Sequence, residues 1–188
     1  MKNLWFGGIM FCAAIVWAAC GNNSASQNDS NKDSATTARV ENKSFNKDAQ
    51  DFALKAANGG MMEVELGKLA EKKSSNKRIQ SFGAMMVKDH SEATEKLRSL
   101  ASANNFILPD SIDDSGRKEI DKLSNKKGVD FDRSYMDMMV GDHNKDLEEF
   151  RKAADNLSDS SLKSFAQVTM PVLAKHLDSA KSITGKKM

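Results

Sequence analysis

The chain has 188 residues, enough for one domain with a hydrophobic core. Aromatic residues make up 6% of the chain and prolines number 2, a composition that favours helices and argues against a β-sandwich. The net charge of +2 arises from 28 basic and 26 acidic residues, and no basic stripe is interleaved with aromatic side chains, which argues against nucleic acid as a partner.

Residues 1–20, MKNLWFGGIMFCAAIVWAAC, are typical of a secretion signal. Lys2 precedes an apolar run that is short for a membrane span and suits the core of a signal peptide. The run ends in Ala-Ala-Cys-Gly and looks like a bacterial lipoprotein signal, in which Cys20 is lipidated and becomes the mature N-terminus. Trp17 departs from this pattern, since leucine is usual there, and the alternative is ordinary cleavage at the two alanines before the cysteine.

Residues 21–44 are polar and nearly free of large apolar side chains. Such a segment cannot bury enough surface to fold, and as a random coil it spans about 25–30 Å. We therefore expect a disordered tether between the lipid anchor and a folded domain. With Cys20 lipidated, no cysteine remains for a disulfide, because Cys12 leaves with the signal. The chain is thus predicted to be secreted and anchored by its lipid in the cell envelope of a Gram-negative bacterium, at the outer membrane.

From residue 45 to 184, apolar residues recur every three or four positions and predict four long amphipathic helices. Glycines at positions 59, 60 and 67 of the first helix are tolerable where another helix approaches closely. A cap is expected at Ser74, Ser75 or Asn76, and Pro171 predicts a kink or a local break. The predicted boundaries are 45–73, a second helix ending at 104–105, a third starting near Asp130, and a fourth after 158–161. The central connection holds a short helix, roughly 113–125, so the predicted fold is an all-α four-helix bundle with one short extra helix.

The chain has three histidines, and each lies on the apolar stripe of a different long helix. The remaining long helix carries Glu63 on its stripe. A buried, unpaired imidazole or carboxylate costs several kcal/mol unless something satisfies it. A single transition-metal ion (Cu, Zn or Fe) at a common meeting point of Glu63, His90, His143 and His176 would satisfy all four. The alternative is that these side chains fill the core and are satisfied by hydrogen bonds.

The runs MMVKDH and MMVGDH surround the first two histidines. Met86 and Met139 lie four residues before a histidine and therefore share its helix face, where a thioether could join the ligands and favour copper. Asp89 and Asp142 directly precede the histidines. They could orient the ligands from outside, or pair with nearby lysines. The methionines have the same two interpretations, as ligands or as core-filling side chains.

Four ordered motifs carry a resemblance to a known family: AANGGMMEVELGKLA (56–70), FGAMMVKDHSEA (82–93), GVDFDRSYMDMMVGDH (128–143) and MPVLAKHL (170–177). Together they resemble the bacterial domain-of-unknown-function family 4142, over about residues 45–183. The resemblance implies a ferritin-like four-helix fold and a place in the cell envelope, since members often carry secretion signals and are described as outer-membrane or periplasmic proteins. It implies no biochemical activity.

Ferritin-like di-iron proteins place a glutamate on two helices and a Glu-x-x-His motif on the other two. The residues of this chain that match are Glu63, His90 and His176. Val87 and Leu173 stand three positions before the two histidines, where glutamates would be required, and His143 or Asp142 stands where the third helix would offer a glutamate. The bridging carboxylates of a di-iron centre are missing, so we expect a mononuclear site at most.

These observations predict a cell-envelope lipoprotein whose ferritin-like domain binds one transition-metal ion, in a role of metal binding or stress protection. The chain shows no Gly-rich phosphate loop and, after the signal, no cysteine nucleophile, which argues against an enzyme. The alternative is a non-catalytic structural or interaction domain without a metal. A third interpretation is an enzyme that uses an open position on the metal.

Overall fold

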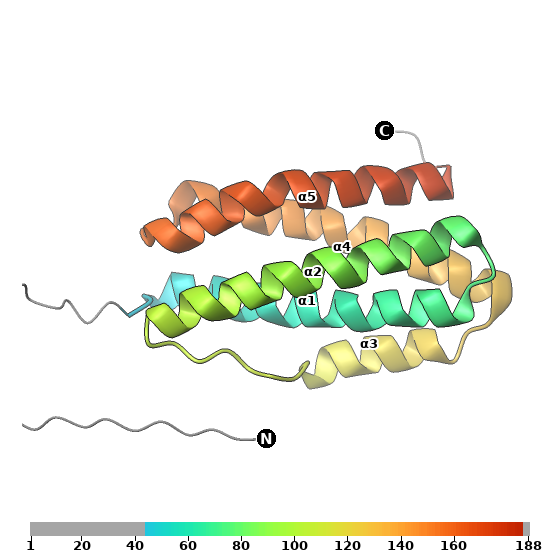
Figure 1. Cartoon of the computed structure of the whole chain (residues 1–188), viewed down its shortest axis with the longest axis horizontal. Helices are drawn as coiled ribbons and strands as arrows, with labels where there is room; N and C mark the ends of the chain where they lie inside the picture. Colours follow the sequence, from blue (N-terminus) through green and yellow to red (C-terminus); the bar gives the residue numbers. More distant parts are fainter. Residues whose placement is uncertain (1–43, 186–188) are drawn as a thin grey trace, which may run out of the picture. The chain divides into compact units, whose positions relative to one another are not determined.

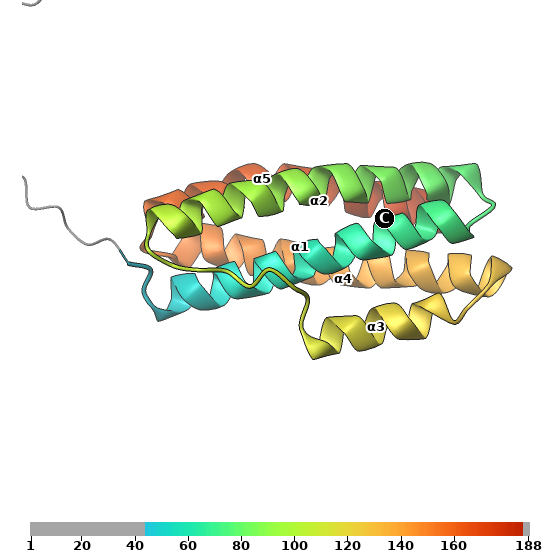
Figure 2. The same cartoon turned by 60° about the horizontal axis from the view of Figure 1, so that its bottom comes forward.

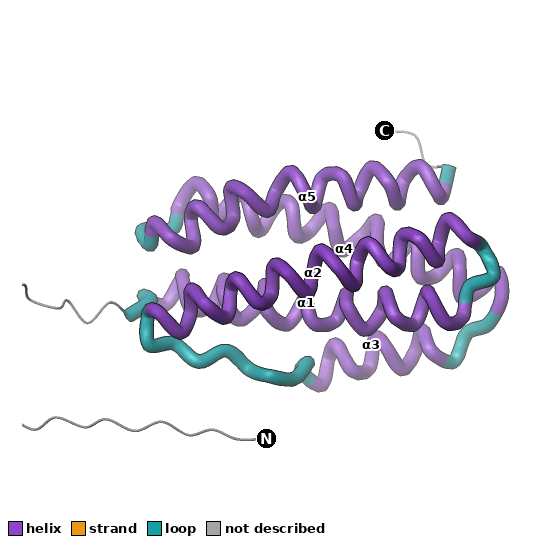
Figure 3. The backbone as a smooth tube through the Cα atoms, in the orientation of Figure 1, coloured by secondary structure: helices purple, strands orange, loops and turns teal. Residues whose placement is uncertain are grey.

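The computed structural model describes residues 44–185. Within this range the chain forms five helices and no strand, which confirms the predicted all-α class (Figures 1 and 3). The helices are α1 (Lys47–Lys73), α2 (Lys77–Ala103), α3 (Asp114–Ser124), α4 (Gly128–Asn156) and α5 (Ser160–Thr184). The predicted signal with Cys20, and the predicted tether up to residue 43, lie outside the described residues.

The long helices α1, α2, α4 and α5 lie side by side along a common direction (Figures 1 and 2). α1 packs mainly against α2, and α4 packs mainly against α5; further contacts join α2 to α5 and α1 to α4, so that the four helices surround one interior. The short helix α3 lies outside this group, against α1 and α4, and the connection before it runs along the outside of the bundle. No helix of residues 44–185 has the length and apolar character needed to cross a membrane.

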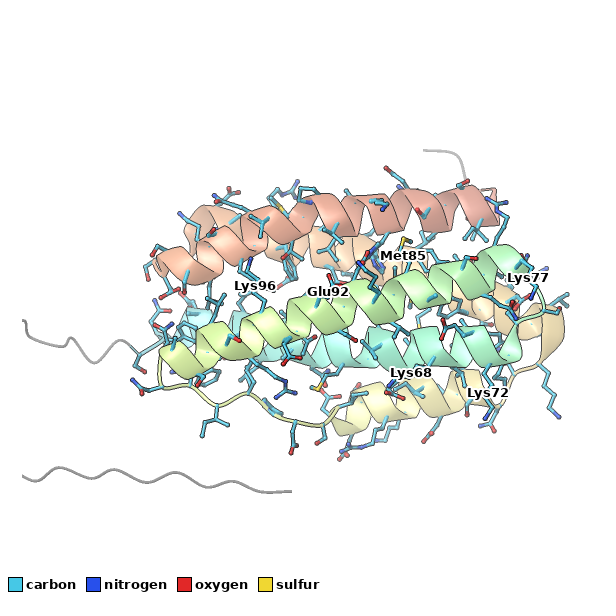
Figure 4. The ribbon with its side chains drawn as sticks, viewed as in Figure 1. Lys68, Lys72, Lys77, Met85, Glu92 and Lys96 are labelled. Atoms are coloured by element: carbon cyan, nitrogen blue, oxygen red, sulfur yellow. The ribbon has the colours of Figure 1, made fainter. Side chains whose placement is uncertain are left out.

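Charged side chains cover the outer faces of α1 and α2. Lys68 and Lys72 on α1, and Glu92 and Lys96 on α2, are exposed and project from the bundle (Figure 4). The apolar faces of the same helices are turned inward, as the three- and four-residue spacing predicts.

Side-chain caps fix the start of four of the five helices. Asn46, Asn76, Asp113 and Asp159 each accept a hydrogen bond from a backbone N–H in the first turn of the helix that follows. The prediction that one of residues 74–76 caps the second long helix is therefore confirmed for Asn76.

Two features of the helices differ from the sequence prediction. The helix expected to start near Asp130 starts at Gly128, and Asp130 lies in its first turn, where its negative charge faces the positive end of the helix dipole. Gly128 has φ 52°, a left-handed conformation that favours glycine, so it marks the turn into α4. Pro171 lies inside α5, which runs unbroken from Ser160 to Thr184, so the predicted local break is wrong.

The interior contains two hydrophobic clusters. The first, which we call the phenylalanine cluster, contains Phe52, Phe150 and Phe165, whose rings contact one another with centroids 5.1 to 6.5 Å apart. The second, the methionine cluster, contains the buried side chains Met86, Met136 and Met139 together with Leu66, Phe82, Phe131 and Tyr135. Both clusters draw on all four long helices.

The helices α1 and α2 approach most closely at Gly67 and Gly83. A Cβ atom added at Gly67 would lie 2.7 Å from the carbonyl oxygen of Gly83, and a Cβ at Gly83 would lie 2.7 Å from the carbonyl oxygen of Gly67. Both neighbours are backbone atoms, which cannot move aside without moving a helix. Close approach was expected for Gly59 as well, but a Cβ there meets nothing within 4 Å.

The variant Gly83→Ala is expected to lower the free energy of unfolding by about 1–3 kcal/mol, because the added methyl group forces α1 and α2 apart. The matched control is Gly141→Ala in α4, where a Cβ meets nothing within 4 Å, and where alanine should stabilise the helix by up to about 1 kcal/mol. Urea denaturation followed by circular dichroism measures both. A Gly83→Ala protein as stable as the control variant would contradict the close contact.

Candidate metal centre

Each long helix brings one polar side chain to the level between the two hydrophobic clusters. On α1, Glu63 follows the residues of the phenylalanine cluster and precedes those of the methionine cluster, and His90, His143 and His176 have the corresponding place on α2, α4 and α5. Glu63 is 1% exposed, His90 is 6% exposed, and both other histidines are fully buried. The bundle therefore encloses four polar groups in an otherwise apolar interior.

The four predicted residues contact one another directly. Glu63 Oε2 lies 3.0 Å from His90 Nδ1, and Glu63 Oε1 lies 3.3 Å from His143 Nδ1. His143 Nε2 lies 3.2 Å from His176 Nδ1. The three imidazoles each offer one nitrogen, and these nitrogens all lie within 4.8 Å of one another. The structure thus brings together all four side chains that the sequence placed on inward faces.

Two of the imidazoles each have one ring nitrogen within hydrogen-bond distance of an oxygen atom. His143 Nδ1 lies 3.0 Å from the backbone carbonyl oxygen of Met139, one turn earlier in α4, and His176 Nε2 lies 2.9 Å from Asp89 Oδ2 on α2. A carbonyl oxygen and an ionised carboxylate can only accept hydrogen bonds, so both ring nitrogens must donate. Burial raises the pKa of Asp89, but hydrogen bonds from His176 and Lys88 outweigh this effect, so its net pKa lies below the usual value and the carboxylate is ionised.

Burial also determines the charge of the imidazoles. It lowers the pKa of His143 to about 4, with a further contribution from His176, and it lowers the pKa of His176 despite the hydrogen bond to Asp89. Each ring is therefore neutral at pH 7 and carries a single N–H, which is already donated to Met139 or Asp89. The remaining nitrogens, His143 Nε2 and His176 Nδ1, both carry lone pairs and face each other across 3.2 Å.

Two lone pairs at this distance repel each other unless a proton or a cation lies between them. Two ligand nitrogens on a tetrahedral metal ion, with bonds of about 2.0–2.1 Å, are about 3.3–3.4 Å apart. The separation of 3.2 Å between His143 Nε2 and His176 Nδ1 is close to this value. An outer acceptor on the other nitrogen of each ring is also what metal-binding histidines usually have.

Glu63 and His90 form a buried pair in which both groups are neutral. Burial, followed by the charges of Asp146 and Asp142, raises the pKa of Glu63 well above its usual value. Burial, followed by His143 and His176, lowers the pKa of His90 to about 3. The carboxyl therefore keeps its proton and donates it to His90 Nδ1. The buried atoms Glu63 Oε1 and His90 Nε2 have no hydrogen-bond partner among the described residues. His90 Nε2 carries the ring proton in this arrangement, so a metal ion can bind it only in exchange for a proton.

Asp146 is a member of the centre that the sequence analysis missed. One carboxylate oxygen of Asp146, one of Glu63 and a nitrogen of His143 all lie within 4.8 Å of one another. Burial, followed by the charge of Asp142, raises the pKa of Asp146 to about 7. The signal was present in the sequence, because Asp146 follows His143 by three residues and such residues are neighbours on a helix.

The other predicted site residues have different places. Met86 and Met139 are fully buried and pack in the methionine cluster, and Met139 contacts the centre through its backbone carbonyl. Asp89 bonds to His176, a residue of another helix, rather than to the histidine that follows it. Asp142 pairs with Lys145 at 3.3 Å. The lysine-pairing interpretation therefore fits Asp142, and the ligand-orienting one fits Asp89.

Fold and site together define an all-α bundle protein with a histidine–carboxyl cluster enclosed between its long helices. The sequence model of the family described as Domain of unknown function (DUF4142) matches residues 34–183, and the chain belongs to this family. No curated protein matches the chain. The crystal structure of a DUF305 fragment from Deinococcus radiodurans is similar, with a TM-score of 0.67 and 10% sequence identity over 77% of this chain and 99% of that one. At this identity the likeness concerns the fold alone.

Proposed function

We propose that the protein binds a single transition-metal ion at the level of Glu63, between the two hydrophobic clusters. The ligands are one nitrogen each of His90, His143 and His176. Glu63 either hydrogen-bonds to the other ring nitrogen of His90 or is itself a fourth ligand. One observation carries this proposal. His143 Nε2 and His176 Nδ1 each carry a lone pair and lie 3.2 Å apart, while the other nitrogen of each ring donates its hydrogen to an oxygen atom.

The ligand types narrow the choice of metal. Imidazoles with a carboxylate suit Zn, Cu(II) or Fe, whereas a thioether ligand from Met86 or Met139, both of which pack in the methionine cluster, would favour Cu(I). Val87 and Leu173 occupy the positions where di-iron bundles carry glutamates, which supports a mononuclear site.

We propose the wider setting from the N-terminal sequence. The bundle is a ferritin-like four-helix domain, tethered by residues 21–44 to a lipid on Cys20 in the cell envelope, at the outer membrane. There the protein would hold a metal ion or protect the envelope against metal or oxidative stress, without turning over a substrate. The alternative is a structural or interaction domain without a metal, and the contacts of Asp89 with His176 and of Glu63 with His90 favour it insofar as they already satisfy part of the cluster.

The test is the metal content of the purified full chain, measured by elemental analysis after incubation with equimolar Zn(II), Cu(II) and Fe(II) in turn and removal of unbound metal. We expect about one metal ion per chain for the wild type and close to none for His143→Ala, as loss of one of three imidazole ligands implies. The control is Glu92→Gln, an exposed change on α2 that should keep the metal. Equally low metal in all three proteins would support the structural alternative.

Metal binding is also expected to release a proton from the Glu63–His90 pair. The metal takes His90 Nε2, Nδ1 must then carry the ring proton, and Glu63 becomes the carboxylate that accepts it. Because burial raises the pKa of Glu63 well above its usual value, the carboxyl holds its proton in the metal-free protein, and binding should release about one proton.

Titration calorimetry in two buffers of different ionisation enthalpy measures this proton. The variant Glu63→Gln keeps the side-chain shape, has no proton to lose, and should release close to none. The sign of the pH dependence follows: affinity rises with pH while Glu63 is protonated, and the imidazoles, with pKa values of about 3 and 4 for His90 and His143, do not compete in this range. Equal proton release by both proteins would contradict the assignment.

A further inference from the structure

A small cavity of about 70 Å³ adjoins the centre on the side of α1. Its polar end is formed by Glu63, His90 and Asp146, and its apolar walls include the rings of the phenylalanine cluster. Lys55, which is exposed, and Glu149, which is half-buried, also line the cavity and form an ion pair of 3.5 Å. The cavity therefore connects the proposed metal position with the surface between α1 and α4.

Small residues on α1 create this space. Gly59 and Gly60 precede Glu63 by four and three residues and so lie on the same face of the helix. Both line the cavity. A Cβ at Gly60 would lie 2.7 Å from Thr94 Oγ1, so Gly60 serves the approach of α2, whereas a Cβ at Gly59 meets nothing within 4 Å. Gly59 therefore borders the cavity at a place where a side chain can be added without a clash.

The size and lining of the cavity restrict what it can hold. A protein cavity of about 150 Å³ binds benzene, with its six heavy atoms, so 70 Å³ suits a molecule of about two or three heavy atoms. Three of the long helices supply imidazoles to the centre and α1 supplies a carboxyl, while residues of all four line the cavity. The unpartnered atoms Glu63 Oε1 and His90 Nε2 belong to residues that line the cavity, so the cavity reaches the centre at Glu63 and His90.

We infer that the cavity is the binding position of a small exogenous ligand that completes the coordination of the metal. The ligand class is a linear or diatomic lone-pair donor of two or three heavy atoms, such as azide, cyanide or dioxygen, with one atom on the metal and the rest against the phenylalanine rings. This inference rests on the metal site proposed above. It adds an open, ligand-accessible coordination position that metal storage alone does not require.

Azide serves as the probe. The full chain is loaded with Cu(II), its metal content is measured, and azide is titrated while the azide-to-copper charge-transfer absorption is recorded. The series Gly59→Ala, Gly59→Val and Gly59→Leu fills the cavity in steps. We expect azide to bind the wild type, and its affinity to fall along the series by at least about tenfold at leucine, as overpacking of a filled site implies, while the metal content stays constant.

The matched control is Gly141→Leu, a glycine in the middle of α4 whose Cβ also meets nothing within 4 Å but which does not line the cavity. Its azide affinity should equal that of the wild type. If the leucine variant at position 59 does not fold, the valine variant decides, since its smaller side chain still fills part of the cavity and should lower the azide affinity. Equal azide affinity across the series, or a copper-loaded wild type that takes up no azide, overturns the inference alone. A wild type that holds no metal overturns the proposed function together with it.

Discussion

Loading the protein with its metal ion should raise its free energy of unfolding by about 4 kcal/mol when the free ion is at about 1,000 times its dissociation constant. For a folded part of the size described, this corresponds to an increase in melting temperature of roughly 10–15 °C. The physical reason is that the ligands come from α2, α4 and α5, so the ion binds only when these helices are assembled. Scanning calorimetry of the metal-free and metal-loaded full chain measures the shift.

The comparison is made within each variant, because His143→Ala also removes buried atoms and lowers the stability of the metal-free protein. For His143→Ala the shift on loading should vanish, whereas for Glu92→Gln, an exposed change on α2, it should equal that of the wild type. A shift of similar size in His143→Ala would mean that the ion stabilises the protein from another place, and would contradict the assigned centre.

The sequence alone predicts the helices and the inward direction of the site residues. Spacings of three and four residues place Glu63, His90, His143 and His176 on apolar stripes, and all four are buried. Spacing along one helix says nothing about how far one helix is shifted along its neighbour. That all four side chains meet at one level follows from the packing of the two hydrophobic clusters on either side of them.

The same limit explains what the sequence did not show. Asp89 bonds to His176 of α5 because of the relative shift of α2 and α5, and nothing in the MMVKDH run contains that information. The contact of Gly67 with Gly83 likewise depends on the register of α1 against α2. Asp146 was within reach, because it follows His143 by three residues, but a carboxylate in a charged stretch ordinarily faces solvent, and only its burial distinguishes it.

The two similar runs MMVKDH and MMVGDH differ in the contacts of their aspartates, and this difference allows a comparison within the chain. The aspartate of the first run, Asp89, accepts a hydrogen bond of 2.9 Å from His176 Nε2, whereas the aspartate of the second, Asp142, pairs with Lys145, whose side chain is 78% exposed. Both residues precede a buried histidine, and both carry a carboxylate of the same size. Asp89 bonds directly to His176, whereas Asp142 acts on the centre only through its charge, which raises the pKa of Glu63 and of Asp146. Removing the two charges in turn therefore separates the hydrogen bond to His176 from a general loss of negative charge near the centre.

The variant Asp89→Asn is expected to weaken metal binding by about 10–100-fold, because the neutral amide is a poorer acceptor for His176 Nε2–H and leaves Nδ1 a weaker ligand. Asp142→Asn should change the affinity less than Asp89→Asn does, because Asp142 bonds to no proposed ligand and acts on the centre only through its charge. Competition titration against a chelator of known affinity measures both. The asparagine at position 89 can still accept the hydrogen bond, so the stability of the metal-free protein should fall by less than about 1 kcal/mol. A weaker affinity at nearly unchanged stability would show that Asp89 acts on the strength of the His176 ligand and not on folding. Equal affinities for the two variants would contradict a role of Asp89 in the centre.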